Sequence, residues 1–98
     1  MIYCFDLDGT LCSSSPGDYA KAVPWQERID VVNRLFDEGN HIKIYTARGM
    51  TTKVNYRSMV KWQLDHWGVK YHELIMGKPA ADIYIDDKGI NAGRFFDE

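Results

Sequence analysis

The chain has 98 residues, of which 45% are hydrophobic and 27% are charged, and its formal net charge is −2. This length predicts one small domain over residues 1–98 with the composition of an ordinary globular protein. The slight acidic excess argues against nucleic-acid or membrane-surface binding, which usually shows a basic balance. We find no apolar run near the roughly 20 residues that span a bilayer and no secretory signal, so we expect a cytoplasmic protein without a membrane partner. Its two cysteines do not make a disulfide framework.

The first half of the chain predicts a strand, a flap, a helix and a second strand. Residues 2–6, IYCFD, form an apolar, β-prone run of the kind found in strands covered on both faces. Residues 11–24 are rich in Ser, Gly and Pro and predict a loop or small flap. Apolar residues at helical spacing predict a helix from about Trp25 to Glu38, which Gly39 ends. Residues 41–46, HIKIYT, predict the second strand.

The second half repeats the alternation. A helix is expected from a cap at Thr51 or Thr52 to about Trp67. Strands are expected at residues 71–75 and 82–86, and the residues after 87 have no clear assignment. Strands that alternate with helices predict a mostly parallel sheet. The expected fold is therefore α/β, a Rossmann-like three-layer α/β/α sandwich.

Polar side chains follow the predicted strand ends. In parallel sheets the ligand crevice lies beyond the carboxyl ends of the strands. The residues that reach this edge are Asp6 and Asp8, Thr46, Lys78, and Asp86 with Asp87. We expect them to converge on one site.

The chemistry of this set points to phosphate and a divalent cation. Four carboxylates at one edge would repel one another unless a cation lay between them, and hard oxygen ligands favour Mg²⁺. One carboxylate of the first pair can attack phosphorus, and the other can transfer a proton. A lysine and a threonine hydroxyl would bind the phosphoryl oxygens, and Gly9 would let backbone amides approach them.

Four short motifs carry a family resemblance. They are DxDGT at residues 6–10, the threonine of IYTAR, the lysine of GKP and the acidic pair of IYIDD. In this order they resemble the haloacid dehalogenase superfamily of phosphohydrolases over nearly the whole chain. The resemblance implies that Asp6 is the nucleophile and a metal ligand, and that Asp8 is the general acid and base and touches the metal through its carbonyl. Because family members that attack carbon lack the second carboxylate, Asp8 favours a phosphatase.

The resemblance also assigns the remaining positions. Thr46 and Lys78 would hold the phosphoryl group, and Asp86 and Asp87 would complete the Mg²⁺ site, with either one as the direct ligand. Further substrate contacts are expected from Gly9, Thr10, Ala47 and Arg48. Arg48 follows the phosphate-binding threonine, and a structural role is an equal alternative for it.

The spacing of the motifs leaves no room for a cap domain. About 35 residues separate the first motif from Thr46, and about 30 separate Thr46 from Lys78. The protein therefore looks like a capless member, whose open site and many aromatic residues favour self-association. TARGM followed by IDDK also looks like small phosphatases of polysaccharide and phosphosugar pathways.

The expected function is thus an Mg²⁺-dependent phosphatase of a small phosphorylated metabolite such as a phosphosugar. A phosphatase of phosphoproteins or of nucleic-acid ends is the enzymatic alternative. A phospho-accepting signalling domain that does not hydrolyse substrate is the alternative of another class. In such domains an acidic pair comes first, whereas here DxD comes first and DD last.

Overall fold

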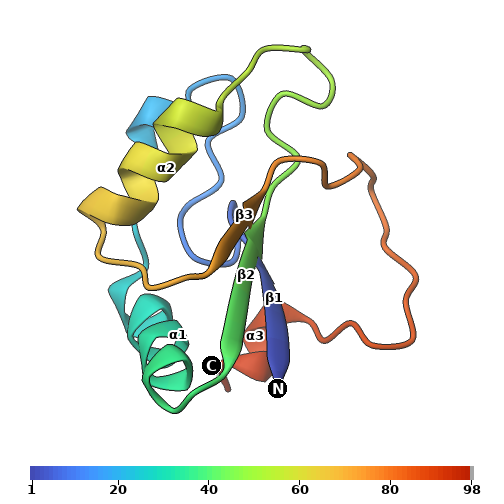
Figure 1. The fold of residues 1–98 in the computed structure, drawn as a ribbon. Coiled ribbons are helices and arrows are strands. Elements are labelled where there is room, and N and C mark those ends of the chain that lie inside the picture. Colours follow the sequence, from blue (N-terminus) through green and yellow to red (C-terminus); the bar gives the residue numbers. More distant parts are fainter. Residues whose placement is uncertain (98) are drawn as a thin grey trace.

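Three parallel strands form the centre of the molecule. The computed structural model describes residues 1–97 (Figure 1). Its sheet has the order β1-β2-β3. The strands are β1 (Ile2–Asp6), β2 (His41–Tyr45) and β3 (Glu73–Ile75), and the helices are α1 (Gln26–Asp37), α2 (Arg57–His66) and α3 (Ala92–Phe95), with a 3₁₀ turn at Tyr19–Lys21.

The register places the ends of the strands together. Phe5 lies opposite Ile44, and Asp6 lies opposite Tyr45. On the other side of β2, Tyr45 lies opposite Ile75. Because all three strands run in parallel, their carboxyl ends meet at the same edge, as the sequence predicts.

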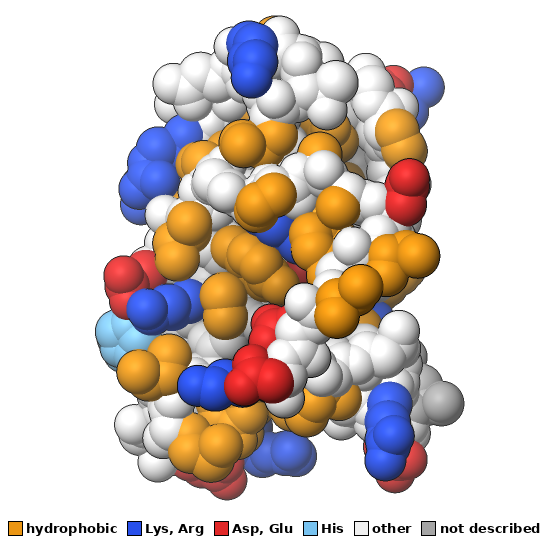
Figure 2. Space-filling model, turned by 90° about the vertical axis from the view of Figure 1, so that its right-hand side faces the viewer, with side chains coloured by type: hydrophobic (Ala, Val, Ile, Leu, Met, Phe, Trp, Pro, Cys, Tyr) orange, Lys and Arg blue, Asp and Glu red, His pale blue; other side chains and the backbone are white. Residues whose placement is uncertain are grey.

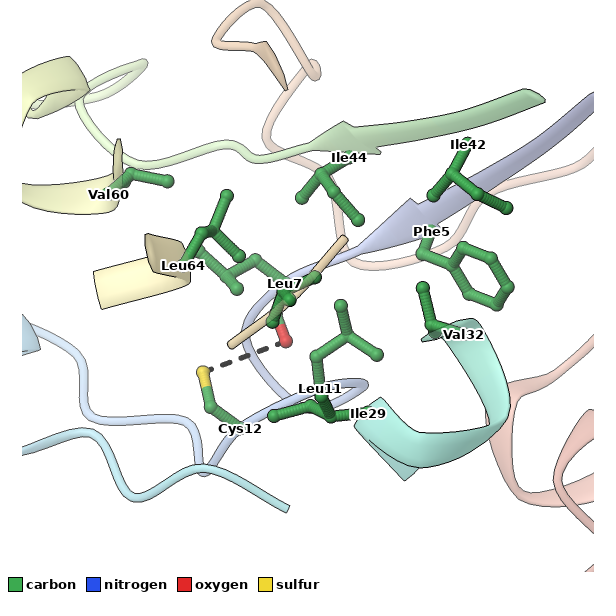
Figure 3. Close-up of a cluster of buried hydrophobic side chains, with 11 residues drawn as sticks. Phe5, Leu7, Leu11, Cys12, Ile29, Val32, Ile42, Ile44, Val60 and Leu64 are labelled. Atoms are coloured by element: carbon green, nitrogen blue, oxygen red, sulfur yellow. Dashed lines mark hydrogen bonds between the residues drawn. The ribbon is translucent and has the colours of Figure 1, made fainter. Parts of the chain in front are cut away.

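One face of the sheet carries the core. Phe5, Ile42 and Ile44 on the strands pack with apolar residues of α1 and α2 and with two buried leucines of the loop after β1 (Figure 3). The helical residues of this cluster are Ile29, Val32, Val60 and Leu64. The short α3 joins the same side, since the rings of Phe95 and Phe96 lie 5.6 and 6.1 Å from that of Phe5. The predicted helix at 25–38 and the strands at 2–6 and 41–46 are confirmed within one residue at each end.

The other face of the sheet differs from the expectation. Ile2 and Cys4 are exposed there, so the prediction that the first strand is covered on both faces is wrong. The α/β class and the parallel sheet are confirmed. The three-layer sandwich needs a further helical layer on this face, and it stays a prediction.

The helix that follows β2 starts later than its sequence predicts. Its first residue is Arg57, and the Asn55 side chain, rather than Thr51 or Thr52, accepts from the Arg57 amide at 3.0 Å. Residues 48–52 form turns and residues 53–56 are irregular; within the turns Gly49 has φ +85°. A Cβ at position 49 would lie 2.1 Å from the carbonyl oxygen of Val54, so only glycine fits there. Residues 51–56, which the sequence predicts as the start of the helix, therefore lie in the loop before α2.

The last third of the chain holds the largest difference. The strand predicted at 71–75 is limited to Glu73–Ile75, and the strand predicted at 82–86 is wrong, because residues 76–91 form an irregular segment (Figure 1). Its apolar side chains find no strand partner; Ile85 is 96% exposed. Tyr84 instead turns back, and its hydroxyl donates to the Pro79 carbonyl. Of the residues after 87, which had no clear assignment, Ala92–Phe95 form α3 rather than a strand.

Candidate active site

The loop after β1 is fixed by its own backbone. The carbonyl of Leu7 accepts from the amides of Thr10 and Leu11 at 3.1 and 2.9 Å. Leu7 and Leu11 are both buried, whereas Asp6 and Asp8 are partly exposed. The buried Leu7 between them therefore anchors two carboxylates that face outward at the end of the strand.

Asp6 meets Lys78 across the edge of the sheet. The Nζ of Lys78 lies 3.2 Å from Asp6 Oδ1, and the Thr10 hydroxyl donates to Asp6 Oδ2 at 3.4 Å. The ammonium also lies 4.7 Å from the ring centre of Tyr45 and 4.3 Å from that of Tyr84. The Lys78 side chain is only 11% exposed, so its charge is held against Asp6 rather than in open solvent. Two residues separated by more than seventy positions thus share one small site.

The backbone of Thr46 holds Lys78 next to Asp6. Its amide donates to the Ile75 carbonyl at 3.1 Å, and its carbonyl accepts from the Lys78 amide at 3.2 Å. These bonds continue the pairing of β2 with β3 past the end of the strands. The Thr46 hydroxyl accepts from the amide of Arg48 at 3.1 Å. Thr46 is buried, and its hydroxyl oxygen is engaged by the Arg48 amide.

Asp8 is held by an arginine. Arg48 donates from Nε to Asp8 Oδ2 at 2.9 Å and from Nη2 to Asp8 Oδ1 at 2.8 Å. The same guanidinium donates from Nη1 to Gln63 Oε1 at 2.6 Å and lies 4.5 Å from the ring centre of Tyr19. Arg48 therefore points inward, as the structural alternative for it predicts, and not toward a substrate. Gln63 was missed as a site residue, although a glutamine on the apolar side of a helix was a signal for a buried polar contact.

The other expected substrate contacts are engaged within the loops. The Gly9 amide donates to the Cys12 carbonyl at 2.8 Å, and the Thr10 amide is bound to Leu7. Gly9 has φ +80°, so the glycine serves the turn itself. The carbonyl of Ala47 accepts from Met50 at 3.0 Å. In this arrangement the amides of Gly9 and Thr10 point to the chain and not to a ligand.

A buried thiol lies under Asp8. Cys12 Sγ is 3.5 Å from Asp8 Oδ1. It also lies 3.7 Å from the Leu7 carbonyl (Figure 3). Burial, assisted by the negative charge of Asp8, raises the pKa of the Cys12 thiol to about 12. Burial also raises the pKa of Tyr45 beside Lys78. Leu7, Leu11 and Cys12 below the carboxylates are fully buried, so the floor of the site is apolar, which strengthens the ion pairs above it.

The second acidic pair is not part of this cluster. Asp86 and Asp87 are exposed on the irregular segment, where Asp86 Oδ1 accepts from the Lys88 amide at 2.9 Å. That hydrogen bond holds the pKa of Asp86 below its usual value. Across residues 1–97 we find no group of three acidic, His or Cys side chains that could hold a metal ion.

The donors present do not complete the expected magnesium site. Asp6 and Asp8 supply hard oxygen atoms, but each faces a cationic side chain of the protein itself. The third carboxylate, from Asp86 or Asp87, is not gathered with them. The structure thus brings together Asp6, Asp8, Thr46 and Lys78 and leaves the predicted metal pair outside.

The comparisons with known proteins bear on the fold. No protein-family profile and no curated protein matches the chain. The crystal structure of a structural-genomics target from Vibrio cholerae is similar, with a TM-score of 0.89 and 29% sequence identity over 99% of this chain and 88% of that one. Its description names no activity, so the likeness supports the architecture alone. Among the described residues there is also no helix with the length and apolar character needed to cross a membrane.

Proposed function

We propose that the protein is a phosphomonoesterase that hydrolyses a small phosphorylated metabolite, with phosphosugars as the leading class. The observation that carries the proposal is the contact of Lys78 Nζ with Asp6 Oδ1 at 3.2 Å, at the end of a parallel strand. An ammonium there can bind a phosphoryl oxygen while the carboxylate attacks phosphorus. Asp8, two residues further, is the neighbouring group that can move a proton.

The reaction has two displacements. In the first, an oxygen of Asp6 attacks phosphorus, the ester P–O bond breaks, and Asp8 gives its proton to the leaving oxygen. In the second, water attacks the phosphorus of phospho-Asp6, Asp8 takes a proton from that water, and inorganic phosphate leaves. Lys78 and the Thr46 hydroxyl bind phosphoryl oxygens in both steps.

Magnesium is included as a requirement, with no step assigned to it. It would neutralise phosphoryl charge at a set made of Asp6, the Asp8 carbonyl and Asp86 or Asp87. Since the acidic pair lies outside the cluster, this set forms only if residues 76–91 change conformation. A haloacid-dehalogenase-like three-layer fold is the architectural part of the same proposal, and a crystal structure grown with Mg²⁺ and phosphate tests both.

The test is a substrate screen of purified protein, with Mg²⁺ and with EDTA. It compares phosphosugars, phosphopeptides and 3′-phosphorylated oligonucleotides. We expect turnover of phosphosugars that Asp6→Asn abolishes while the protein stays folded. As a control, Asp82→Asn changes an exposed carboxylate of the irregular segment and leaves turnover unchanged. Turnover confined to the polymers would contradict the substrate class, and full activity of Asp6→Asn would contradict the mechanism.

A further inference from the structure

We infer that Arg48 is a positioning residue that fixes the carboxylate of Asp8 for proton transfer, and that Gln63 and Tyr19 hold Arg48 in place. This role rests on the proposed function, in which Asp8 moves protons. It differs from the substrate contact that the sequence suggests for Arg48.

The first support is burial. The Arg48 side chain is 0% exposed, and that of Asp8 is 20% exposed. A buried cation is tolerated only when charged and polar partners surround it. Here the partners are the two oxygens of Asp8, the amide oxygen of Gln63 and the ring of Tyr19. A guanidinium enclosed in this way has no path to a substrate phosphate.

The second support is geometry. The two bonds from Arg48 to Asp8 are parallel and bidentate, and such a pair fixes the plane of a carboxylate as well as its position. Asp8 Oδ1 also accepts from Cys12, whereas Oδ2 has one partner, Arg48, among the described contacts. Each carboxylate oxygen has two lone pairs. Proton transfer therefore goes through the remaining lone pair of Oδ2.

The third support is the bracing around Arg48, which comes from distant parts of the chain. The Nε2 of Gln63, on α2, donates to the Tyr19 carbonyl at 2.8 Å. The Tyr19 ring meets the Tyr56 ring edge-on at 5.0 Å between centres. The flap and α2 are thus joined at the arginine that holds Asp8. Since a catalytic group displaced by about 1 Å can lose roughly 10²-fold in rate, this bracing bears directly on the reaction.

The test uses two substrates that differ in their need for a proton. The leaving group of p-nitrophenyl phosphate departs without one, whereas that of glycerol 2-phosphate needs one. The ratio kcat/KM covers the steps up to departure of the leaving group. Arg48→Lys keeps the charge and loses the bidentate fork. We expect it to lower kcat/KM on glycerol 2-phosphate about 10²-fold, the lower end of a general-acid effect, and on p-nitrophenyl phosphate only about threefold.

A double-mutant cycle separates positioning from a merely structural role. If Arg48 acts through Asp8, Arg48→Lys has almost no further effect on glycerol 2-phosphate turnover in the Asp8→Asn background. Gln63→Met should also lower kcat/KM more on glycerol 2-phosphate than on p-nitrophenyl phosphate, by a smaller factor. It replaces Arg48→Lys in the test if that variant does not fold. Arg34→Lys, a change on the exposed side of α1, is the control, and it should leave kcat/KM unchanged on both substrates.

The outcomes are distinct. Equal losses on both substrates, a rise in KM alone, or independent effects in the cycle would overturn the positioning role while leaving the phosphatase intact. Wild-type protein that hydrolyses neither these probes nor the screened substrates would overturn the proposed function, and the role of Arg48 with it.

Discussion

The loop at residues 6–12 and the segment at residues 76–91 both carry carboxylates that the sequence assigns to one site, but the structure holds them in opposite ways. The loop is closed by backbone hydrogen bonds to Leu7, and its two leucines are buried. The segment has no strand or helix, and Ile83, Ile85 and Ile90 are exposed on it. Figure 2, which views this side of the molecule, shows hydrophobic side chains spread over the surface.

The difference shows which part of the site is prepared in advance. Asp6 and Asp8 already meet their cationic partners, Lys78 and Arg48, at hydrogen-bond distance. Asp86 bonds only within its own segment. In the proposed reaction, attack on phosphorus and proton transfer would use carboxylates that already contact their partners, whereas metal binding would use a segment with few contacts.

The largest expected effect tests the link between these two regions. Lys78 belongs to the segment but is fixed to Asp6 and Thr46. Lys78→Met should lower kcat/KM for the best substrate of the screen about 10²–10³-fold, because one donor to the phosphoryl oxygens is lost. Lys88→Met removes an exposed lysine of the same segment and is the matched control. If Lys78→Met lowers kcat/KM less than about twofold, Lys78 does not bind the phosphoryl group.

A smaller effect is expected in the segment itself. Asp86→Asn or Asp87→Asn should raise the Mg²⁺ concentration at half-maximal activity about 10–100-fold, whichever residue ligates the metal. Neither change should alter the melting temperature, because both side chains are exposed. If both variants keep the wild-type dependence on Mg²⁺, the acidic pair has no part in metal binding.

The smallest effect concerns stability rather than activity. The folded pKa of Cys12 is raised from 9.0 to about 12, so the unfolded chain loses this proton first as the pH rises. The free energy of unfolding should therefore be at its full value below pH 9.0 and fall between pH 9.0 and about 12. Urea unfolding across this range should show a shallower fall for Cys12→Ala than for the wild type. Equal slopes would mean that the thiol is not held in the apolar floor of the site.

The sequence predicts the loop at residues 6–12 better than the irregular segment, for physical reasons. An apolar run followed by DxDGT specifies a strand and a turn, and both are local properties. The meeting of Asp6 with Lys78 follows from the parallel order of the strands, and the structure confirms it. The prediction of a strand at 82–86 is wrong because a β-prone IYI run indicates an extended chain but not the strand that it would pair with. The sequence allowed a structural role for Arg48 but not its partners, because these come from the first strand end, the flap and α2.

The central claim is that Asp6 becomes phosphorylated during turnover. Rapid acid quenching of the reaction, followed by peptide mass spectrometry, tests it most directly, with Asp8→Asn included to slow hydrolysis of the intermediate. The account predicts one phosphoryl group on the peptide that contains Asp6, more of it in Asp8→Asn, and none in Asp6→Asn. A stable phosphoprotein that does not release phosphate would identify a phospho-accepting signalling domain instead. Turnover with no phosphoryl group on Asp6, or with the group on another residue, would contradict the account.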